Sequence, residues 1–327
     1  STRFFATTPL KTDTSFIKSY SDVFTFRLVS INKSNKFSID LNQSNNSIKY
    51  KPNSQWNLGF GINYKWLGFD LAFSLPFLNK DDAILGPTKR LDLQTNIYLR
   101  KLIVDVFFQF YKGYHVSNPQ NIIPGWKPGD AIPINQNMKS YSLGGSVIYV
   151  FNNREFSYKA AFNLNERQKK RAGSFILGAG IFNITLKNDS GFVSSNSFPE
   201  LPVNVTDFDK AVLGSLYFEG GYAYTFVYNN WYASLSLAIG GGLSSIKTRE
   251  LLSGDARKTN AFSFIVDFRG SMGYNGDIWY GGFSFFTGNF FVNNRENLNI
   301  NFGLSNIRFF VGYRFYRLVE NIQNRKK

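Results

Sequence analysis

The chain has 327 residues, which suffice for one large domain or two small ones. Its 35 Phe, 18 Tyr and 28 Gly against 2 Met fit pleated strands joined by polar turns and fit helices poorly. The absence of cysteine and the single histidine argue against disulfides and zinc or copper sites, so we expect no metal and no cofactor. The net charge of +15 fits a solvated set of basic loops and turns, contact with lipopolysaccharide phosphates or an anion-preferring lumen. Because the basic residues are scattered, we expect no nucleic-acid partner.

The two ends of the chain differ from its middle. Residues 1–20 show neither sustained alternation nor a signal-peptide pattern, so we expect a periplasmic lead segment from which any signal peptide has been removed. Residues 317–327 are expected to form a short basic C-terminal tail. Between them, residues 21–316 alternate apolar and polar residues with period two, which predicts β-strands and no separate soluble domain.

The alternation recurs throughout this region. Between Trp56 and Trp66, large apolar residues alternate with Asn, Gly and Lys. The same pattern follows in 67–77, 91–100, 102–110, 156–164, 262–268 and 307–315. Short turn-forming stretches separate many of these segments, and longer connections are expected at 79–87, 116–137, 187–209 and 252–258.

Three features favour a membrane barrel over a soluble β-sandwich, whose inner face is also apolar. The apolar face often holds large residues over about 9–11 positions, the length that a tilted membrane strand needs. Aromatic residues gather at strand ends, and the opposite face carries charged residues, amides and Gly. We therefore predict an all-β fold, a transmembrane antiparallel up-and-down β-barrel of about 14 strands, within a range of about 12–16.

Strand counting leaves one conflict. If every alternating segment crosses the membrane once, the loops 116–137 and 187–209 lie on opposite sides, whereas such barrels keep their long loops outside. Either one strand is miscounted or one long loop is periplasmic. The suspected places are 22–50 and 296–316, where the alternation changes phase.

Three stretches resemble a known family. They are Tyr50–Trp66, which begins Tyr-Lys-Pro-Asn, Phe107–Tyr114, which reads Phe-Phe-Gln-Phe-Tyr-Lys-Gly-Tyr, and Glu166–Phe175. Together they resemble an uncharacterised outer-membrane β-barrel family of Bacteroidota-type bacteria, a domain of unknown function. The resemblance implies a barrel in the outer membrane and supplies no activity, and it makes an accessory role in a larger membrane assembly a fair expectation.

Ionisable residues in the alternating segments should face the lumen, because Arg or Lys facing lipid at mid-bilayer costs about 2–4 kcal/mol. They either line a conducting pore or form a salt-bridge mesh that closes it, and we favour a narrow or occluded lumen. The predicted lumen-lining residues are Asp70, Asp92, Arg100, Asp105, Lys159, Asp267, Arg269, Arg308 and Arg314. The predicted interfacial aromatic residues are Trp66, Trp231, Trp279 and Tyr316.

The only histidine suggests a second function class. His115 begins the string His-Val-Ser-Asn, which resembles the local motif of outer-membrane phospholipases and lipid A deacylases. With period two, His115 and Ser117 would project from one face of a strand, so that the imidazole could activate the hydroxyl while Asn118 or an acid orients the ring. The alternative is that these three residues only begin a proline-rich loop.

The sequence therefore predicts a non-enzymatic outer-membrane protein, either a narrow transport barrel or a structural subunit of a larger outer-membrane complex. Its expected partners are outer-membrane lipids and lipopolysaccharide, together with other outer-membrane proteins if it is a subunit. A lipid esterase that uses His115 and Ser117 is the alternative function.

Overall fold

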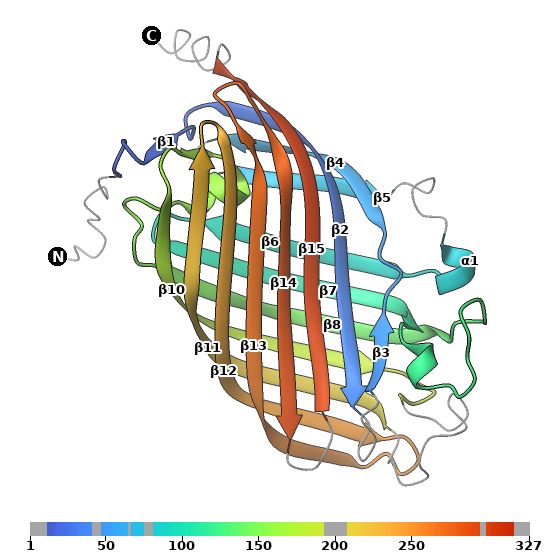
Figure 1. Cartoon of the computed structure of the whole chain (residues 1–327). Coiled ribbons are helices and arrows are strands. Elements are labelled where there is room, and N and C mark those ends of the chain that lie inside the picture. The colour runs from blue at the N-terminus through green and yellow to red at the C-terminus, as the bar shows by residue number, and fades with distance from the viewer. Residues whose placement is uncertain are drawn as a thin grey trace, which may run out of the picture.

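A computed structural model describes residues 12–40, 47–64, 67–74, 81–192, 208–294 and 299–316. These residues form a long antiparallel β-barrel (Figure 1). Thirteen of its strands belong to one sheet, and the sheet closes because β15 pairs with β2 over its whole length. No helix in the described part of the chain is long and apolar enough to cross a membrane.

Ten of the thirteen strands form the closed ring. They are β2 (Phe24–Asp40), β3 (Ser47–Lys51), β7 (Leu102–Val116), β8 (Ile134–Val150), β10 (Ala172–Lys187), β11 (Phe208–Tyr228), β12 (Trp231–Glu250), β13 (Ala256–Asn275), β14 (Trp279–Asn294) and β15 (Asn299–Phe315). Three strands lie outside the ring: β4 (Trp56–Tyr64) pairs with β2, β5 (Leu67–Ser74) with β4, and β6 (Lys89–Tyr98) with β7. The predicted count of about 14 strands was close but not exact.

The remaining elements are short. Strands β1 (Ile17–Ser19) and β9 (Glu166–Gln168) form a separate two-stranded sheet. Helix α1 (Asp82–Leu85) and the single turns η2 (Pro119–Asn121) and η3 (Lys159–Asn163) complete the described structure, and η3 is π-helical.

Alternation determines which face of each strand points outward. Leu28, Phe218 and Leu243 are 61%, 63% and 76% exposed, whereas Arg27 and Glu219, one position away from the first two, are buried. A β-strand turns successive side chains to opposite faces, so the apolar set makes an outer belt and the polar set faces inward. This confirms the period-two interpretation for the ring strands.

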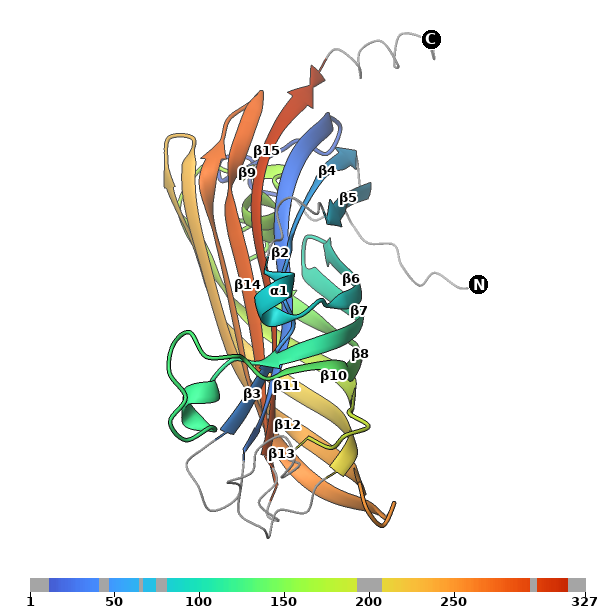
Figure 2. The same cartoon turned by 90° about the vertical axis from the view of Figure 1, so that its right-hand side faces the viewer.

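The long connections lie at one end of the barrel. Phe24 pairs with Phe315, so the barrel begins and finishes at the same end, together with the connections 229–230 and 276–278. We call this the turn end. The connections 117–133 and 251–255 lie at the opposite end, the loop end, where β10 also finishes and β11 begins (Figures 1 and 2).

The expected strand at 156–164 is wrong, and this error caused the conflict over loop sidedness. Residues 151–171 connect β8 to β10, and we call them the plug. Residues 156–168, the middle of the plug, pack inside the turn end instead of crossing the barrel. Within the plug, both the residues of the apolar set, such as Phe162, and the intervening Ala161 are buried. With this segment removed from the strand count, β7 and β10, the strands before the two long loops, finish at the same end.

Two apolar clusters fill the lumen on either side of its middle. The cluster at the loop end is built from inward-facing wall residues such as Phe37, Tyr114, Phe182 and Phe290. The cluster at the turn end combines the plug, including Phe162, with residues of the barrel wall. The two clusters favour the occluded form of the lumen over an open pore.

Candidate lumen cavity and its plug

A cavity of about 440 Å³ lies in the middle of the lumen, between the two apolar clusters. Phe162 and Asn163 of the plug line it on the side of the turn end. Tyr217, Phe290 and Leu304 line it on the side of the loop end. Between these boundaries the wall strands contribute charged and amide side chains, so the cavity is polar at its waist and apolar at both ends.

Asp70 is the centre of one charged cluster in this cavity. Its carboxylate accepts a hydrogen bond from Arg27 Nε at 2.6 Å on one oxygen and from Arg308 Nη1 at 3.1 Å on the other. The side chains of Arg27 and Asp70 are 6% and 15% exposed. Bidentate placement of one carboxylate between two guanidinium groups gives short, charge-assisted hydrogen bonds and fixes both arginines.

Arg269 is the centre of a second cluster. Its Nη2 atom donates to Asp105 at 2.7 Å and to Asp267 at 3.0 Å. Asn96 of β6 also donates to Asp105, at 2.5 Å. The cluster therefore joins β6, β7 and β13 across the lumen.

Asp92 of β6 receives the third set of polar contacts. Tyr111 donates to it at 2.5 Å and Gln109 at 2.8 Å, and Lys33 lies 3.5 Å from its other oxygen. The three clusters together place four basic groups and four carboxylates at the cavity: Arg27, Lys33, Arg269 and Arg308 against Asp70, Asp92, Asp105 and Asp267. Because every one of these groups is paired, the cavity has no positive excess of the kind that an anion-preferring lumen requires.

Barrel-wall arginines hold the plug by its backbone. The carbonyl groups of residues 162–164 accept hydrogen bonds from Arg308, Arg27 and Arg314, at 2.5, 3.2 and 2.7 Å in that order. Carbonyl groups at the end of a helical turn lack intrahelical partners and carry partial negative charge, which guanidinium groups satisfy. The left-handed backbone of Leu164, with φ 62°, ends η3 at this point.

Neutral donors bind the preceding carbonyl groups. Ala161 O accepts from Ser271 at 2.7 Å and from Tyr232 at 3.2 Å. Asn275 donates to Ala160 O at 3.3 Å and to Glu166 O at 3.0 Å. The plug is thus bound through main-chain groups as well as through its apolar side chains. The neutral donors come from β12 and β13, and the arginines come from β2 and β15.

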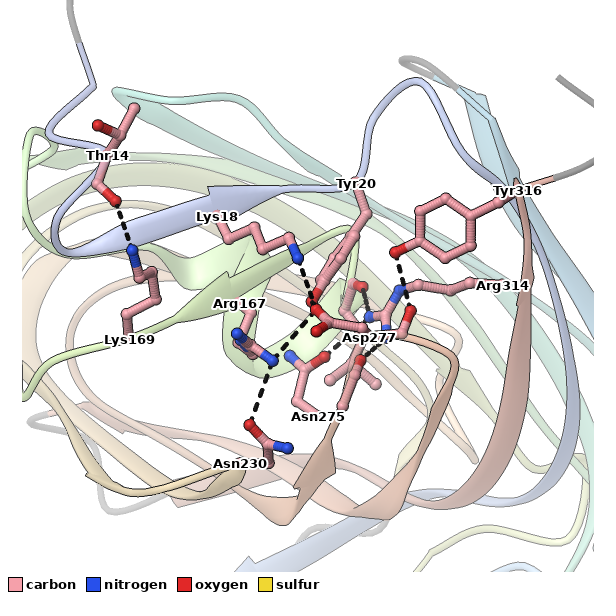
Figure 3. A network of polar contacts seen from close by, with 12 residues as sticks. Thr14, Lys18, Tyr20, Arg167, Lys169, Asn230, Asn275, Asp277, Arg314 and Tyr316 are labelled. Carbon is pink, nitrogen blue, oxygen red and sulfur yellow. Dashed lines mark hydrogen bonds and ion pairs between the residues drawn. The ribbon is translucent and has the colours of Figure 1, made fainter. Parts of the chain in front are cut away.

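The lead segment fastens the plug to the barrel rim (Figure 3). Strand β1 pairs with β9 of the plug, so that the two segments form one small sheet. Asp277, in the turn between β13 and β14, then accepts hydrogen bonds from Lys18 and Tyr20, each at 2.7 Å, and lies 3.3 Å from Arg167 of β9. The guanidinium of Arg314 lies 3.8 Å from the centre of the Tyr20 ring. These contacts close the turn end.

The contacts of Asp277 shift the pKa of two groups at the turn end. The hydrogen bonds from Lys18 and Tyr20 lower the pKa of Asp277 below its ordinary value. Burial, reinforced by the hydrogen bond to Asp277, raises the pKa of Tyr20 above its ordinary value. The Asp277 carboxylate therefore stays ionised and the Tyr20 hydroxyl stays protonated near neutral pH, which is the pairing that the contact needs.

The structure brings Asp70, Asp92, Asp105, Asp267, Arg269 and Arg308, of the predicted lumen-lining residues, to the central cavity. Arg100 and Arg314 lie toward the turn end and bind the plug, Arg100 through Glu166 at 2.7 Å. Lys159 is the correction in this set. It belongs to η3 of the plug and not to a wall strand, because 156–164 is not a strand.

Of the predicted interfacial aromatic residues, Trp231 and Trp279 are 59% and 58% exposed, and Tyr316 is 38% exposed. All three lie at the turn end, beside the short connections. Trp66 lies outside the described residues.

The geometry around His115 does not assemble an esterase site. His115 is buried, and its Nδ1 atom has no hydrogen-bond partner among the described residues. Ser117 Oγ donates instead to Lys49 O at 3.3 Å. The Asn118 side chain accepts from Lys49 N at 2.9 Å and donates to Ser47 O at 2.7 Å, so both residues fasten β3.

Sequence reasoning missed three inward-facing residues. Arg27 and Lys33 lie on β2, where the expected change of phase hid the alternation. Glu219 of β11 is buried with both carboxylate oxygens unpartnered among the described residues. In the sequence, Glu219 lies in the string Phe-Glu-Gly-Gly within an alternating segment, which could have indicated that it faces inward. The described residues include no group of three or more His, Cys, Asp or Glu side chains that could hold a metal ion.

The sequence matches the family described as "Domain of unknown function (DUF4421)" over residues 11–315. The chain belongs to this family. The match confirms the resemblance to a family without assigned activity. A search of curated proteins finds no match to the chain.

Solved structures that resemble the chain include three bacterial proteins. The outer membrane protease OmpT from Escherichia coli is 7% identical, with a TM-score of 0.37 and coverage of 91% of this chain and 98% of that chain. The toluene transporter TodX from P. putida is 10% identical, with a TM-score of 0.30 and coverage of 90% and 91%. The translocator domain of the autotransporter NalP from Neisseria meningitidis is 7% identical, with a TM-score of 0.30 and coverage of 89% and 88%.

Proposed function

We propose that this chain is an outer-membrane β-barrel without a catalytic role, whose lumen is closed at rest and whose central cavity binds a small solute or lipid on its way across the membrane. The observation that carries the proposal is the charged cavity between the plug and the apolar cluster of the loop end. Replacing buried ion pairs by apolar residues is often neutral or stabilising, so stability alone does not account for three charged clusters. Ionisable residues inside a membrane span are a functional hypothesis by default.

The outer belt supports the membrane location. Its exposed residues are large and apolar on strand after strand, as Leu28, Phe218 and Leu243 illustrate. Such a surface would drive association of the protein in water, whereas in a bilayer it contacts the acyl chains of lipids. Because barrels of the outer membrane have short periplasmic turns, the turn end with the plug faces the periplasm in this proposal.

A transport role requires that the plug can leave its position. Its polar anchors suit this requirement, because water can replace hydrogen bonds to main-chain carbonyl groups when the segment moves. Arg314, unlike Arg27 and Arg308, is not among the residues that line the cavity. It holds the plug, the lead segment and the rim together through Leu164, Tyr20 and Asn275. We expect loss of this side chain to open the turn end without altering the cavity lining.

A cysteine placed in the cavity tests this expectation directly, because the natural chain has none. Ser146 of β8 lines the cavity, so Ser146→Cys reports whether a water-soluble maleimide reaches it in proteoliposomes. Labelling should be slow in the otherwise unchanged chain. Adding Arg314→Met should raise the rate about tenfold or more, the factor that corresponds to about 1.4 kcal/mol in the equilibrium for plug opening.

The matched control is Arg249→Met in the same background. Arg249 is an exposed arginine at the loop end, paired with Asp209, and it does not touch the plug. Asn275→Ala, which removes two plug contacts, serves as a second loosening variant. If both loosening variants label no faster than the control, the plug does not gate the cavity and the proposed transport role is wrong.

A further inference from the structure

The barrel wall has a break between β5 and β6. Strand β5 pairs with β4 and strand β6 pairs with β7, but no ladder joins β5 to β6 within the described residues. Figure 2 shows the two strands apart, above the level at which β3 bridges the wall. That bridge is short, since β3 pairs with β7 only through Tyr50 and Lys51.

Specific residues fix the chain at the border of the break that lies toward the loop end. Pro52 follows β3 directly and cannot donate to a sheet ladder, which separates β3 from β4. The next residue, Asn53, is buried and binds the connection that precedes β6, with Asp82 at 2.9 Å and Gly86 O at 3.3 Å. Its backbone N–H donates to Thr88 at 2.9 Å. The Lys-Pro-Asn string thus ends one strand and fixes the chain that passes below the break.

The central cavity extends into this break. Its lining includes Asp70 of β5 on one side and Gln94 and Asn96 of β6 on the other. It also includes Leu93 and Thr95, which belong to the opposite, outward-facing set of β6. A cavity that touches five consecutive residues of one strand, 92–96, reaches the edge of that strand.

The two sides of the break differ sharply in polarity. On the outside, Leu71 and Phe73 of β5 and Leu91 and Leu93 of β6 are exposed apolar side chains of the membrane belt. On the inside, the ion-paired clusters provide basic and acidic groups within one cavity. The unpaired strand edges also offer N–H and C=O groups, which a hydrocarbon environment cannot satisfy.

We propose that this break is a lateral passage through which the head group of a zwitterionic bilayer phospholipid reaches the cavity. The acyl chains stay in the bilayer, against Leu71, Phe73 and Leu93. The phosphate lies toward the guanidinium groups of Arg27 and Arg308, and the cationic end of the head group lies toward the carboxylates of the β6 side. The inference rests on the proposed function and specifies the ligand class and its route.

The test uses a lipid that carries its reactive group on the head. Gln94→Cys and Asn96→Cys are made separately in the cysteine-free chain and reconstituted in phosphatidylcholine vesicles that contain phosphatidylethanolamine with a maleimide on its head-group nitrogen. This probe keeps the phosphate and lacks the ammonium charge, so it reports entry of the phosphate end of the head group. Both variants should become lipid-linked, which mass spectrometry detects as an added lipid. Ser263→Cys, which faces the packed lumen near the loop end, should stay unlabelled. Leu99→Cys, exposed at the turn end, should label and shows that the reagent is active.

The inference is overturned if Gln94→Cys and Asn96→Cys stay unlabelled like Ser263→Cys while Leu99→Cys reacts. A second arm separates this failure from failure of the proposed function. In the Arg314→Met background a water-soluble maleimide should reach Gln94→Cys through the turn end whether or not the break admits lipid. Labelling in this arm alone means that the cavity is a solute site without lateral access, and labelling in neither arm rejects both proposals.

Discussion

Asp70→Asn should destabilise the barrel by about 3 kcal/mol, because it leaves two buried guanidinium groups without their shared carboxylate. Asp70 is bonded to Arg27 at 2.6 Å and to Arg308 at 3.1 Å, and all three side chains are less than one fifth exposed. Removing one partner of a buried pair costs about 3–5 kcal/mol in general, and the amide oxygen that remains offsets part of that cost. The expected loss in the free energy of unfolding is therefore at the lower limit of this range, about 3 kcal/mol.

The free energy of unfolding is measured by urea titration of the barrel in phospholipid vesicles, with tryptophan fluorescence as the signal. Asp209→Asn is the matched control, since the Asp209 side chain is 13% exposed, much like that of Asp70, but its partner Arg249 is 51% exposed. A pair whose guanidinium is open to solvent contributes less than a buried one, about 0–1 kcal/mol. A double-mutant cycle with Arg308→Met should show strong coupling to Asp70→Asn. If Asp70→Asn costs no more than the control, the charged clusters do not organise the lumen as described.

Two further predictions concern the turn end and β3. Because the hydrogen bonds from Lys18 and Tyr20 lower the pKa of Asp277, docking of the lead segment is stabilised in full above the ordinary pKa of 3.8 and weakens as the pH falls through the lower folded value. Limited proteolysis should therefore cut before β2 faster in acid with an acid-active protease, and Asp277→Asn should abolish this dependence. Asn118→Ala should lower the free energy of unfolding by about 1–3 kcal/mol, because it leaves two backbone groups of β3 without their partner. Ser117→Ala should lower it by less than about 0.5 kcal/mol. Equal losses would show that the Asn118 side chain does not hold β3.

Much of the wall was predictable because period two has a direct physical meaning. On β6, the apolar residues Leu91, Leu93 and Ile97 are exposed, while Asp92 faces the cavity. Each such assignment needs only the pleat of a strand and the cost of a charge in lipid. The same reasoning placed Asp105 and Arg269 among the inward-facing residues, although it could not pair them.

The plug was not predictable by the same means. From Phe156 to Leu164 every second residue is apolar, which is the pattern of a strand, yet the segment is buried on all sides and forms a π-helical turn. Periodicity distinguishes two faces only where one of them meets a different environment, and inside a lumen both faces meet protein. The charged run from Glu166 to Arg171 was the one local sign that the segment does not continue through a membrane.

The pairing of distant residues lies beyond sequence patterns for a different reason. Asp70 and Arg308 are 238 positions apart and meet only because the ring closes between β2 and β15. Closure depends on the number of strands and on their register. The false strand at 156–164 raised the predicted number of strands by one, and alternation does not predict the register. The break between β5 and β6 is likewise hidden from alternation, which shows the two faces of a strand but not its neighbours.

The most direct test of a lumen closed at rest is planar-bilayer conductance of the purified, intact chain. The plug at the turn end and the apolar cluster at the loop end predict a silent bilayer over the usual range of voltage, in the presence of inserted protein verified by antibody or label. Steady single-channel conductance, and above all conductance that favours anions, would contradict both the closed lumen and the charge balance of its cavity.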